Sequence, residues 1–417
     1  MEDGSFLWDE KEQGIVLGAE YYGFVTTQLL GGRLAEIIGA KWVIGMGVFG
    51  ASLLTLLEPS AAQLGIGPLV AARVIEGMGK GVLVPAKFAL LASWVPVHER
   101  SVLVAITGQG AMFGLLIAAP LTGAICKNLS WEYAFYIYGS LGCLWFVFWM
   151  WYVHNSPEEH PYMSEEERSY ILKYRQSGKR SSQKRPVPWK KVITSRAVWI
   201  LTFTKFFAAF GFYTVLTEIP SYFKTVLHFD IQNSRLWTAT LYVAQSITMA
   251  ISAILADYMR SRKCMNITDI RKLLQSIAIL GSTLCFVAIA HVGCNYYTAI
   301  FVLILETSFY GFTSGGDGPM AADIAPDFAG TVVGVMHTII ETAGVLAPLA
   351  VGLLTQHNAS MQQWRKVFYL VGGINVAGTL LFVLFSTAEP EPWAVEYKEY
   401  QELKIVLSKE DGSSEED

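Results

Sequence analysis

Charged residues are scarce in this sequence. Asp, Glu, Lys and Arg make up 16% of its 417 residues, whereas an ordinary globular chain carries roughly 25%. The 31 Lys and Arg against 35 Asp and Glu give a net charge of −4, so there is no basic excess. Without that excess, a nucleic-acid-binding surface is not expected. The high share of hydrophobic residues, 53%, excludes a disordered chain.

Cysteines and catalytic motifs are equally sparse. The five cysteines are scattered, with neither a CxxC pair nor the spacing of a zinc site, so neither a disulfide framework nor a metal centre is expected. The hydrolase signatures HExxH and GxSxG do not occur, and the segment Gly77–Gly81 lacks the spacing of a phosphate loop. We therefore predict that the protein is not an enzyme, with no catalytic residue, no metal and no cofactor.

Long apolar stretches are abundant instead. Mean hydropathy is +0.38, and apolar segments recur at about 20 residues, the length that crosses the hydrocarbon core of a bilayer. The sequence contains about eleven such windows. They are 13–32, 42–57, 66–93, 101–125, 131–153, 196–222, 233–256, 272–291, 296–321, 329–355 and 363–386. This pattern predicts an all-α, multi-pass membrane protein.

A polar segment divides the windows into two groups. We predict an N-terminal transmembrane half at 1–153, a cytosolic linker at 154–195, a C-terminal transmembrane half at 196–388 and an acidic cytosolic tail at 389–417. Within the linker, Ser164 is followed three residues later by a Glu. This is the pattern of a capping box, which predicts a short surface helix.

Basic residues near the window ends predict the orientation of the chain. The segments around Arg33, Arg100 and Arg260 are basic, so they are expected on the cytosolic side. The segment 58–60, Glu-Pro-Ser, contains no basic residue and is predicted to be a loop on the opposite side. The choice between a plasma membrane and a vesicular or lysosomal membrane stays open.

A short sequence motif occurs once in each half. Residues 32–41 and 253–262 both place Leu, Ala and an acidic residue before basic residues, the acids being Glu36 and Asp257. Parallel repeats of helical halves are a known transporter plan. This repeated motif resembles the signature between the second and third helices of the major facilitator superfamily.

Further motifs resemble one branch of that superfamily, the anion:cation symporters (solute carrier family 17, which includes sialin, vesicular glutamate transporters and sodium/phosphate cotransporters). The motifs follow the family's order along nearly the whole chain. They are Trp8-Asp9, Gln13-Gly14-Ile15, Tyr22-Gly23-Phe24, Thr27-Gln28, Arg73-Val74-Ile75-Glu76-Gly77, Trp94-Val95-Pro96, Glu99-Arg100-Ser101, Pro188-Trp189, Phe212-Tyr213, Asp323-Ile324-Ala325-Pro326 and Pro392-Trp393-Ala394. The resemblance implies two pseudo-symmetric helical halves, alternating access, and transport of organic anions or phosphate driven by protons, sodium or membrane potential.

Departures from the family pattern bear on the substrate. The match starts at the family's second helix, and the first helix has no counterpart in this sequence. Arg73 and Glu76 match the family, but Lys80 stands where members carry a Glu. A helix-seven Arg and a helix-ten His of the glutamate transporters fall on Ala208 and Ala321. Glutamate is therefore not the expected substrate.

Charged and titratable residues inside the apolar windows are the candidate functional residues. Burying a charge at the bilayer centre costs at least about 2.5 kcal/mol, so such a residue should be paired or should face a wet cavity. The candidates are Glu20, Arg73, Glu76, Lys80, Lys87, Lys205, Glu306, Asp317, His337 and Glu341.

Four of these residues repeat at helical spacing. Arg73, Glu76, Lys80 and Lys87 fall within about 60° of arc on one helix. Three cations with one carboxylate favour an anion path, in which Arg binds bidentately and Lys acts as a point charge. We predict that the three cations bind substrate and that Glu76 couples transport to protons. The alternative is that Glu76 is neutralised by Arg73 or Lys80 as part of the scaffold.

Two further predictions concern partners for these charges. Glu20 is predicted either to offset Lys80 across two helices or to face the cavity, and in both cases it joins the ion-coupling set. Lys205 and Tyr213 are predicted to complete the substrate site, with snorkelling of Lys205 to the interface as the alternative.

The last candidates lie near the C-terminal end of the chain. His337 and Glu341 are spaced i, i+4, which suits a proton relay or a polar packing pair. Asp317 lies in the Gly-rich segment 311–319, which is predicted to be a bent or unwound helix lining a cavity, with a sodium site as one reading.

Taken together, these features predict a secondary active transporter of small anions, such as inorganic phosphate or carboxylates. We expect protons or sodium as the coupling ion, a small anionic solute and the lipid bilayer as partners, and a monomer. The alternative is an anion-binding or sensing membrane protein that does not cycle, or a shortened isoform without transport. The missing first helix and Lys80 both favour this alternative, because a permanently cationic path would retain anions.

Overall fold

A computed structural model describes residues 10–174, 187–218, 222, 226, 231–292, 295–355 and 360–394. Within these residues all regular secondary structure is helical, which confirms the predicted all-α class. The motif Trp8-Asp9, the basic residues between 175 and 186, and the tail beyond residue 394 lie outside the described part.

The helices before the linker follow the first predicted windows. They are α1 (Glu10–Ile38), α2 (Ala40–Leu64), α3 (Ile66–Gly81), α4 (Leu83–Trp94), η1 (Val97–Glu99), α5 (Arg100–Asn128) and α6 (Trp131–Tyr152). The linker holds η2 (Pro157–Glu159), α7 (Glu165–Tyr174) and α8 (Trp189–Thr194). The Ser164 hydroxyl accepts from the Glu167 backbone N–H at 3.2 Å, which confirms the predicted cap of α7.

The helices after the linker follow the remaining windows. They are α9 (Arg196–Tyr213), η3 (Thr214–Glu218), α11 (Ile231–Ser261), α12 (Ile267–Ile289), α13 (Tyr296–Gly311), η4 (Phe312–Ser314), α14 (Met320–Ile324), η5 (Pro326–Phe328), α15 (Ala329–Ile340), α16 (Ala343–Thr355) and α17 (Met361–Phe385).

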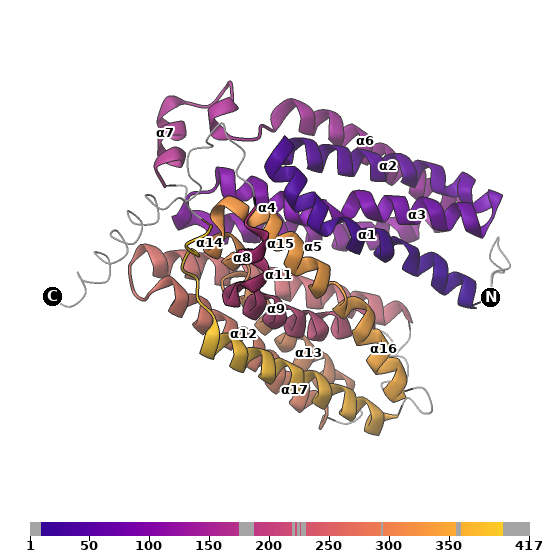
Figure 1. The fold of residues 1–417 in the computed structure, drawn as a ribbon. Coiled ribbons are helices and arrows are strands. Elements are labelled where there is room, and N and C mark those ends of the chain that lie inside the picture. The colour runs from indigo at the N-terminus through magenta and orange to yellow at the C-terminus, as the bar shows by residue number, and fades with distance from the viewer. Residues whose placement is uncertain are drawn as a thin grey trace. The chain divides into compact units, whose positions relative to one another are not determined.

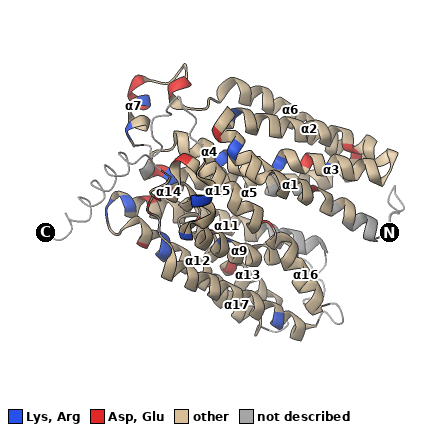
Figure 2. Ribbon diagram, viewed as in Figure 1, with Lys and Arg blue, Asp and Glu red and all other residues tan. Residues whose placement is uncertain are grey.

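Eight helices of the described chain are long and apolar enough to cross a membrane. The other predicted windows hold α1, α3 with α4, and α13. The last three of these helices are shorter, at 16, 12 and 16 residues. Figure 2 shows long helices with little charge, whereas Lys, Arg, Asp and Glu gather on α7 and near α14.

The contacts group the chain into two compact units. The first contains Met1–Trp94, Ala118–Ser169 and Phe328–Thr338, and the second contains Val95–Ile117, Tyr170–Asp327 and Ile339–Asp417. Each unit thus takes one short segment from the other half of the sequence. The predicted division into halves at the linker stays a prediction.

In the first unit, α1 packs along α3, and α2 packs on α3 and α6 (Figure 1). Glycines make the α1–α3 approach close. A Cβ on Gly23 would lie 1.9 Å from the Val74 carbonyl oxygen, and one on Gly77 would lie 2.0 Å from the Glu20 carbonyl oxygen. Only glycine permits this approach, which brings the charged side chains of α1 and α3 within reach of one another.

In the second unit, α12 packs between α13 and α17, α11 packs on α13, and α9 packs on α17. Apolar side chains such as Leu274, Phe286 and Phe368 fill the space between these helices and are fully buried. The Gly-rich segment bends as predicted, since α13 ends at Gly311 and regular α-helix resumes only at Met320.

The acidic residues of the repeated motif, Glu36 and Asp257, make the same kind of contact in the two units. Glu36, at the end of α1, accepts from the backbone N–H and the hydroxyl of Thr331 at 2.7 and 2.6 Å. Asp257, near the end of α11, accepts from the backbone N–H groups of Ser101 and Val102 at 3.2 and 2.8 Å. Both carboxylates therefore cap the first turn of a helix, α15 or α5, where unsatisfied N–H groups favour negative charge.

Two predictions about local structure were wrong. Residues 58–60 are not a loop, because α2 continues to Leu64 and Glu58 is 2% exposed. Arg73 and Lys87 are not on one uninterrupted helix, because α3 ends at Gly81 and α4 begins at Leu83. The interruption precedes Pro85, which has no N–H to donate to the carbonyl four residues earlier.

Candidate functional site

Five charged residues of α1, α2 and α3 form what we call the carboxylate cluster: Glu20, Glu58, Arg73, Glu76 and Lys80. Its centre is the Lys80 ammonium, whose Nζ lies 2.7 Å from Glu20 Oε1 and 2.9 Å from Glu76 Oε1. The predicted Glu20–Lys80 pair is confirmed. Of the two partners considered for Glu76, Lys80 makes the contact.

Glu58 is a member of the cluster that the sequence did not reveal. Its Oε2 lies 3.3 Å from Arg73 Nη2, and its carboxyl group lies within hydrogen-bonding reach of that of Glu76. Thr55, one turn earlier on α2, donates to Glu76 Oε1 at 2.9 Å. The spacing of Thr55 and Glu58, i and i+3 on one helical face, was the available signal, but the Pro that follows Glu58 suggested a turn.

A cavity adjoins this cluster in the first unit. Its volume is about 460 Å³, within the range of about 300–1,000 Å³ typical of small-molecule sites. Glu76 and Lys80 contribute its charge, and the hydroxyls of Ser52, Thr55 and Thr122 line it together with Tyr138 and apolar side chains. The cavity therefore offers one cation to a small anion, beside hydroxyl side chains whose protons go to acceptors within the protein.

The anion path predicted from Arg73, Glu76, Lys80 and Lys87 does not have the expected excess of cations. Three carboxylates accompany Arg73 and Lys80, so the cluster carries a net charge of −1 when every group is ionised. Lys87 lies on α4 with its Nζ 5.3 Å from the centre of the Phe88 ring. Its predicted role in binding substrate stays a prediction.

Lys205 and Asp317 form a second candidate centre, in the second unit. Lys205 Nζ lies 3.1 Å from Asp317 Oδ1, so Lys205 is paired and does not snorkel. Gln275 donates to Asp317 Oδ2 at 3.2 Å and accepts from the Asp317 backbone N–H at 3.2 Å. The Lys205 ammonium already pairs with the Asp317 carboxylate, which a sodium ion would need as a ligand. This pairing argues against the predicted sodium site at Asp317.

Tyr213 contacts a different predicted residue, Glu341. Its hydroxyl donates to Glu341 Oε2 at 2.5 Å. Glu341 follows the last residue of α15, Ile340, and precedes α16. The predicted proton relay or packing pair of His337 and Glu341 stays a prediction. Glu306 on α13 is 2% exposed and accepts from the Ser282 hydroxyl at 2.6 Å.

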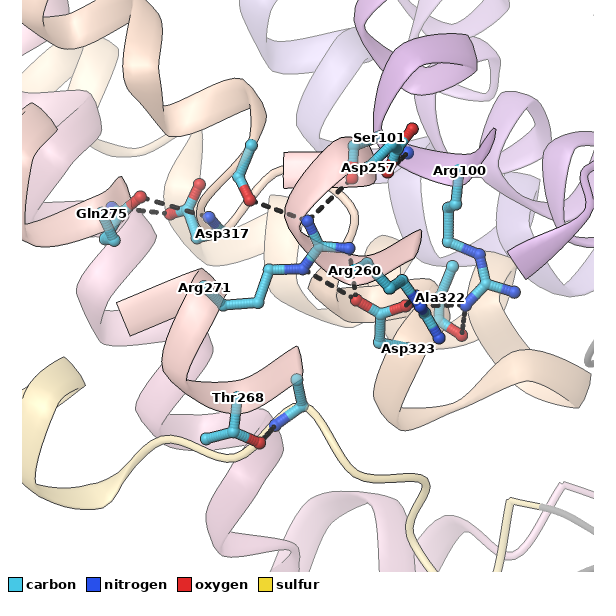
Figure 3. A network of polar contacts seen from close by, with 12 residues as sticks. Arg100, Ser101, Asp257, Arg260, Thr268, Arg271, Gln275, Asp317, Ala322 and Asp323 are labelled. Atoms are coloured by element: carbon cyan, nitrogen blue, oxygen red, sulfur yellow. Dashed lines mark hydrogen bonds and ion pairs between the residues drawn. The ribbon is translucent and has the colours of Figure 1, made fainter. Parts of the chain in front are cut away.

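Five residues of the second unit form what we call the arginine network: Arg100, Asp257, Arg260, Arg271 and Asp323 (Figure 3). Asp323 is 2% exposed, and its carboxylate meets Arg100 at 2.7 Å, Arg271 at 3.0 Å and Arg260 at 3.9 Å.

Neutral acceptors complete the arginine network. Arg271 also donates to the Ser101 hydroxyl at 2.8 Å and to the Gly315 carbonyl at 2.7 Å. Arg100 donates to the Ala322 carbonyl at 3.2 Å. From the sequence, the arginines looked like loop residues facing the cytosol. The structure shows Arg100 and Arg271 1% exposed instead.

Among the described residues, no group of three or more His, Cys, Asp and Glu side chains is arranged to hold a metal ion. The polar centres of both units are instead ion pairs and hydrogen-bonded carboxyls. Such intramembrane charges mark substrate and ion pathways in transporters.

Comparison with known proteins agrees with this architecture. The sequence profile of the Major Facilitator Superfamily matches residues 3–348. The structure of the proton:xylose symporter XylE, bound to 6-bromo-6-deoxy-D-glucose, superposes with a TM-score of 0.71 over 95% of this chain and 91% of that chain, at 17% identity. The fucose:proton symporter FucP of E. coli gives a TM-score of 0.63 over 89% of this chain and 91% of that chain, at 12% identity.

Three other transporters are more similar to this chain in sequence than the two symporters are. Human sialin is 37% identical over 390 residues, which are 94% of this chain and 78% of sialin. Sodium-dependent phosphate transport protein 3 of Mus musculus is 33% identical over 94% of this chain and 81% of its own length. Vesicular glutamate transporter 3 of Danio rerio is 32% identical over 94% of this chain and 67% of its own length. The chain therefore belongs to the major facilitator superfamily, in the solute carrier family of sialin, the vesicular glutamate transporters and the sodium-dependent phosphate transport proteins, and is a multi-pass membrane transporter and not an enzyme.

Proposed function

We propose that the protein transports a small anion, inorganic phosphate or a carboxylate, by alternating access and in symport with protons. The observation that supports this most directly is Lys80 at the wall of the cavity, with its ammonium held between Glu20 and Glu76. A lysine held by two carboxylates is a poor anion site until one of them is neutralised. A proton on Glu76 would release Lys80 toward the cavity, so that proton and anion bind together.

The hydroxyls of the cavity suit the same class of substrate. Ser52, Thr55, Thr122 and Tyr138 carry hydroxyls that would donate to a phosphate or carboxylate oxygen in place of their present acceptors within the protein. In the second unit, Lys205, Tyr213 and Asp317 are the residues we assign to the same pathway, because each is a polar group within an otherwise apolar helical bundle. Ala208 and Ala321 are buried and carry no charge, which argues against glutamate.

The pairing of Lys80 also bears on the alternative of an anion sensor that does not cycle. That alternative relied on a permanently available cation in the path. Because Glu20 and Glu76 neutralise Lys80, the cluster would not retain an anion after the proton leaves. This favours transport over permanent binding.

The test is uptake of labelled anions into proteoliposomes that contain the purified full chain. Inorganic phosphate, glutamate and a set of small monocarboxylates are offered while the pH gradient and the sodium gradient are varied independently. We expect concentrative uptake of phosphate or a monocarboxylate that follows the pH gradient and ignores sodium. Saturable binding without flux, or uptake that follows sodium alone, would contradict the proposal.

Variants connect the uptake to the cavity. Lys80→Met should abolish most of the uptake because it removes the cation of the cavity. Lys127→Met is the matched control, since Lys127 is exposed at the end of α5. Equal loss in both variants would show that the cavity is not the route.

A further inference from the structure

Glu58 is the most deeply buried charge of the carboxylate cluster, and its place in transport is not explained by anion binding. It is 2% exposed, and it does not line the cavity. One of its oxygens, Oε1, is buried without a hydrogen-bond donor among the described residues. A buried carboxylate oxygen without a hydrogen-bond donor destabilises the folded protein. We therefore expect a proton or a further group to stabilise this oxygen.

The neighbouring carboxyl group of Glu76 can supply the missing hydrogen-bond donor. The Glu58 and Glu76 carboxyl groups lie within hydrogen-bonding reach of each other, and a carboxylate is an acceptor only. Two carboxyl groups placed in this way can form a hydrogen bond only when one of them carries a proton. Two like charges in contact cannot both ionise readily, which is how carboxyl pairs come to share one proton.

The charge balance of the cluster leads to the same conclusion. Glu20, Glu58 and Glu76 face Arg73 and Lys80, so the fully ionised cluster has a net charge of −1. One proton brings it to zero. A neutral cluster is the favourable state in a region from which water is largely excluded.

The helices packed against the pair bring few other titratable groups. α1 contributes Glu20 and α3 contributes Arg73 and Lys80, already counted. On α6, the Tyr138 hydroxyl lines the cavity and donates to the Ala118 carbonyl at 3.1 Å. Glu132, also on α6, is bonded to the exposed Gln63 at 3.2 Å. On α4, Lys87 lies over the Phe88 ring.

We propose that Glu58 and Glu76 form one shared proton site, with Arg73 fixing Glu58 on one side and Lys80 fixing Glu76 on the other. Glu58 is then the second coupling carboxyl of the transporter. This inference rests on the proposed function and specifies the site of its coupling ion. When the shared proton leaves to the cavity water, both carboxylates are charged, and the cluster gains one negative charge that disfavours a bound anion.

The proton is measured directly, without a substrate. Infrared difference spectra of the full chain in liposomes, recorded across a pH titration, distinguish protonated carboxyl groups from carboxylates. We expect the wild type to lose one carboxylic-acid band as the pH rises. Glu58→Gln and Glu76→Gln should each remove that band, because either change leaves a single carboxylate bonded to an amide or to a cation.

Matched variants keep the assignment specific. Glu132→Gln, on the neighbouring helix α6, should leave the band and its midpoint unchanged. Glu306→Gln identifies the separate contribution of the other buried glutamate. If the band and its midpoint are the same in Glu58→Gln as in the wild type, Glu58 has no share of the proton and the proposal is wrong.

A conservative variant covers the case in which Glu58→Gln does not fold, as judged by its size-exclusion profile. Glu58→Asp retains a carboxyl but shortens its reach, so the band should remain with a shifted midpoint, and an unshifted midpoint would contradict the shared site. Because the spectra need no flux, a normal band in a protein without uptake would reject the proposed function while leaving the shared proton in place.

Discussion

The carboxylate cluster and the arginine network are similar in size but opposite in composition. The cluster has three carboxylates and two cations, whereas the network has three arginines and two aspartates. Excess carboxylate can be neutralised by a proton, but an arginine does not give up its proton in a protein. The network therefore uses carbonyl and hydroxyl acceptors instead, at Ala322, Gly315 and Ser101.

The two regions also differ in their access to water. Lys80 is 37% exposed at its side chain and lines a cavity. Asp323, Arg100 and Arg271 are at most 3% exposed at theirs. A group that must exchange a proton or an anion needs a wet path, and a group that holds helices together does not. We infer that the cluster serves transport and that the network mainly stabilises the second unit.

Arg271→Ala should have the largest effect on stability. The substitution leaves Asp323 with one strong partner fewer and deprives the Ser101 hydroxyl and the Gly315 carbonyl of their donor. Breaking such a buried ion pair costs about 3–5 kcal/mol. The midpoint of thermal unfolding in detergent should fall sharply, whereas Arg262→Ala, at an exposed residue over the Tyr258 ring, should change it little. Equal effects of the two variants would remove the distinction between the regions.

Ser101→Ala removes the Ser101 hydroxyl, which interacts with both Arg271 and Asp257. The hydroxyl accepts from Arg271 at 2.8 Å, and the backbone N–H that caps Asp257 is retained. Hydrogen bonds to charged groups contribute about 1.5–3 kcal/mol, and the same thermal measurement reports the loss. As control, Ser93→Ala removes only a bond to the Ala89 carbonyl of the same helix. A Ser101→Ala variant as stable as that control would show that Arg271 does not depend on this acceptor.

Lys80→Glu should lower stability less than the network variants, because the partly exposed pair is screened by water. We expect about 1 kcal/mol, in the range of coupled charge pairs. The double variant Glu20→Lys, Lys80→Glu re-forms the 2.7 Å contact with reversed sign but places a carboxylate beside Glu76. It should therefore regain only part of the loss. Additive losses in a double-mutant cycle would mean that the pair is not coupled.

Glu132→Gln should have the smallest effect. Its contact with Gln63 is exposed, and surface substitutions usually change stability by no more than about 0.5 kcal/mol. Both the thermal midpoint and the uptake should match the wild type. A larger change would indicate that the outer end of α6 takes part in the cluster.

Much of the architecture could be predicted from the sequence because membrane spans are defined by composition. Apolar length alone located the windows, and the helix at α7 followed from Ser164 and Glu167. The Glu20–Lys80 pair was also predictable, because Lys80 needed a partner on an adjacent helix. The role of Glu58 was not, because a glutamate followed by proline reads equally well as a loop.

Local spacing also failed where the helices are interrupted. Lys87 has the right periodicity to share a face with Arg73 and Lys80, but the helix is interrupted at Val82 between them. The spacing rule holds only within one continuous helix. A proline or turn that interrupts the helix changes which side chains share a face.

The sequence by itself determined that this protein lies in a membrane, because its scarcity of charge and its apolar windows admit no other environment. It also determined which few charges need an explanation, since each one is costly in hydrocarbon. Only the tertiary structure decided the partners of those charges. Pairing depends on contacts between helices that are distant in sequence, such as the close approach of α1 and α3 at Gly23 and Gly77, which no periodicity within a single helix specifies.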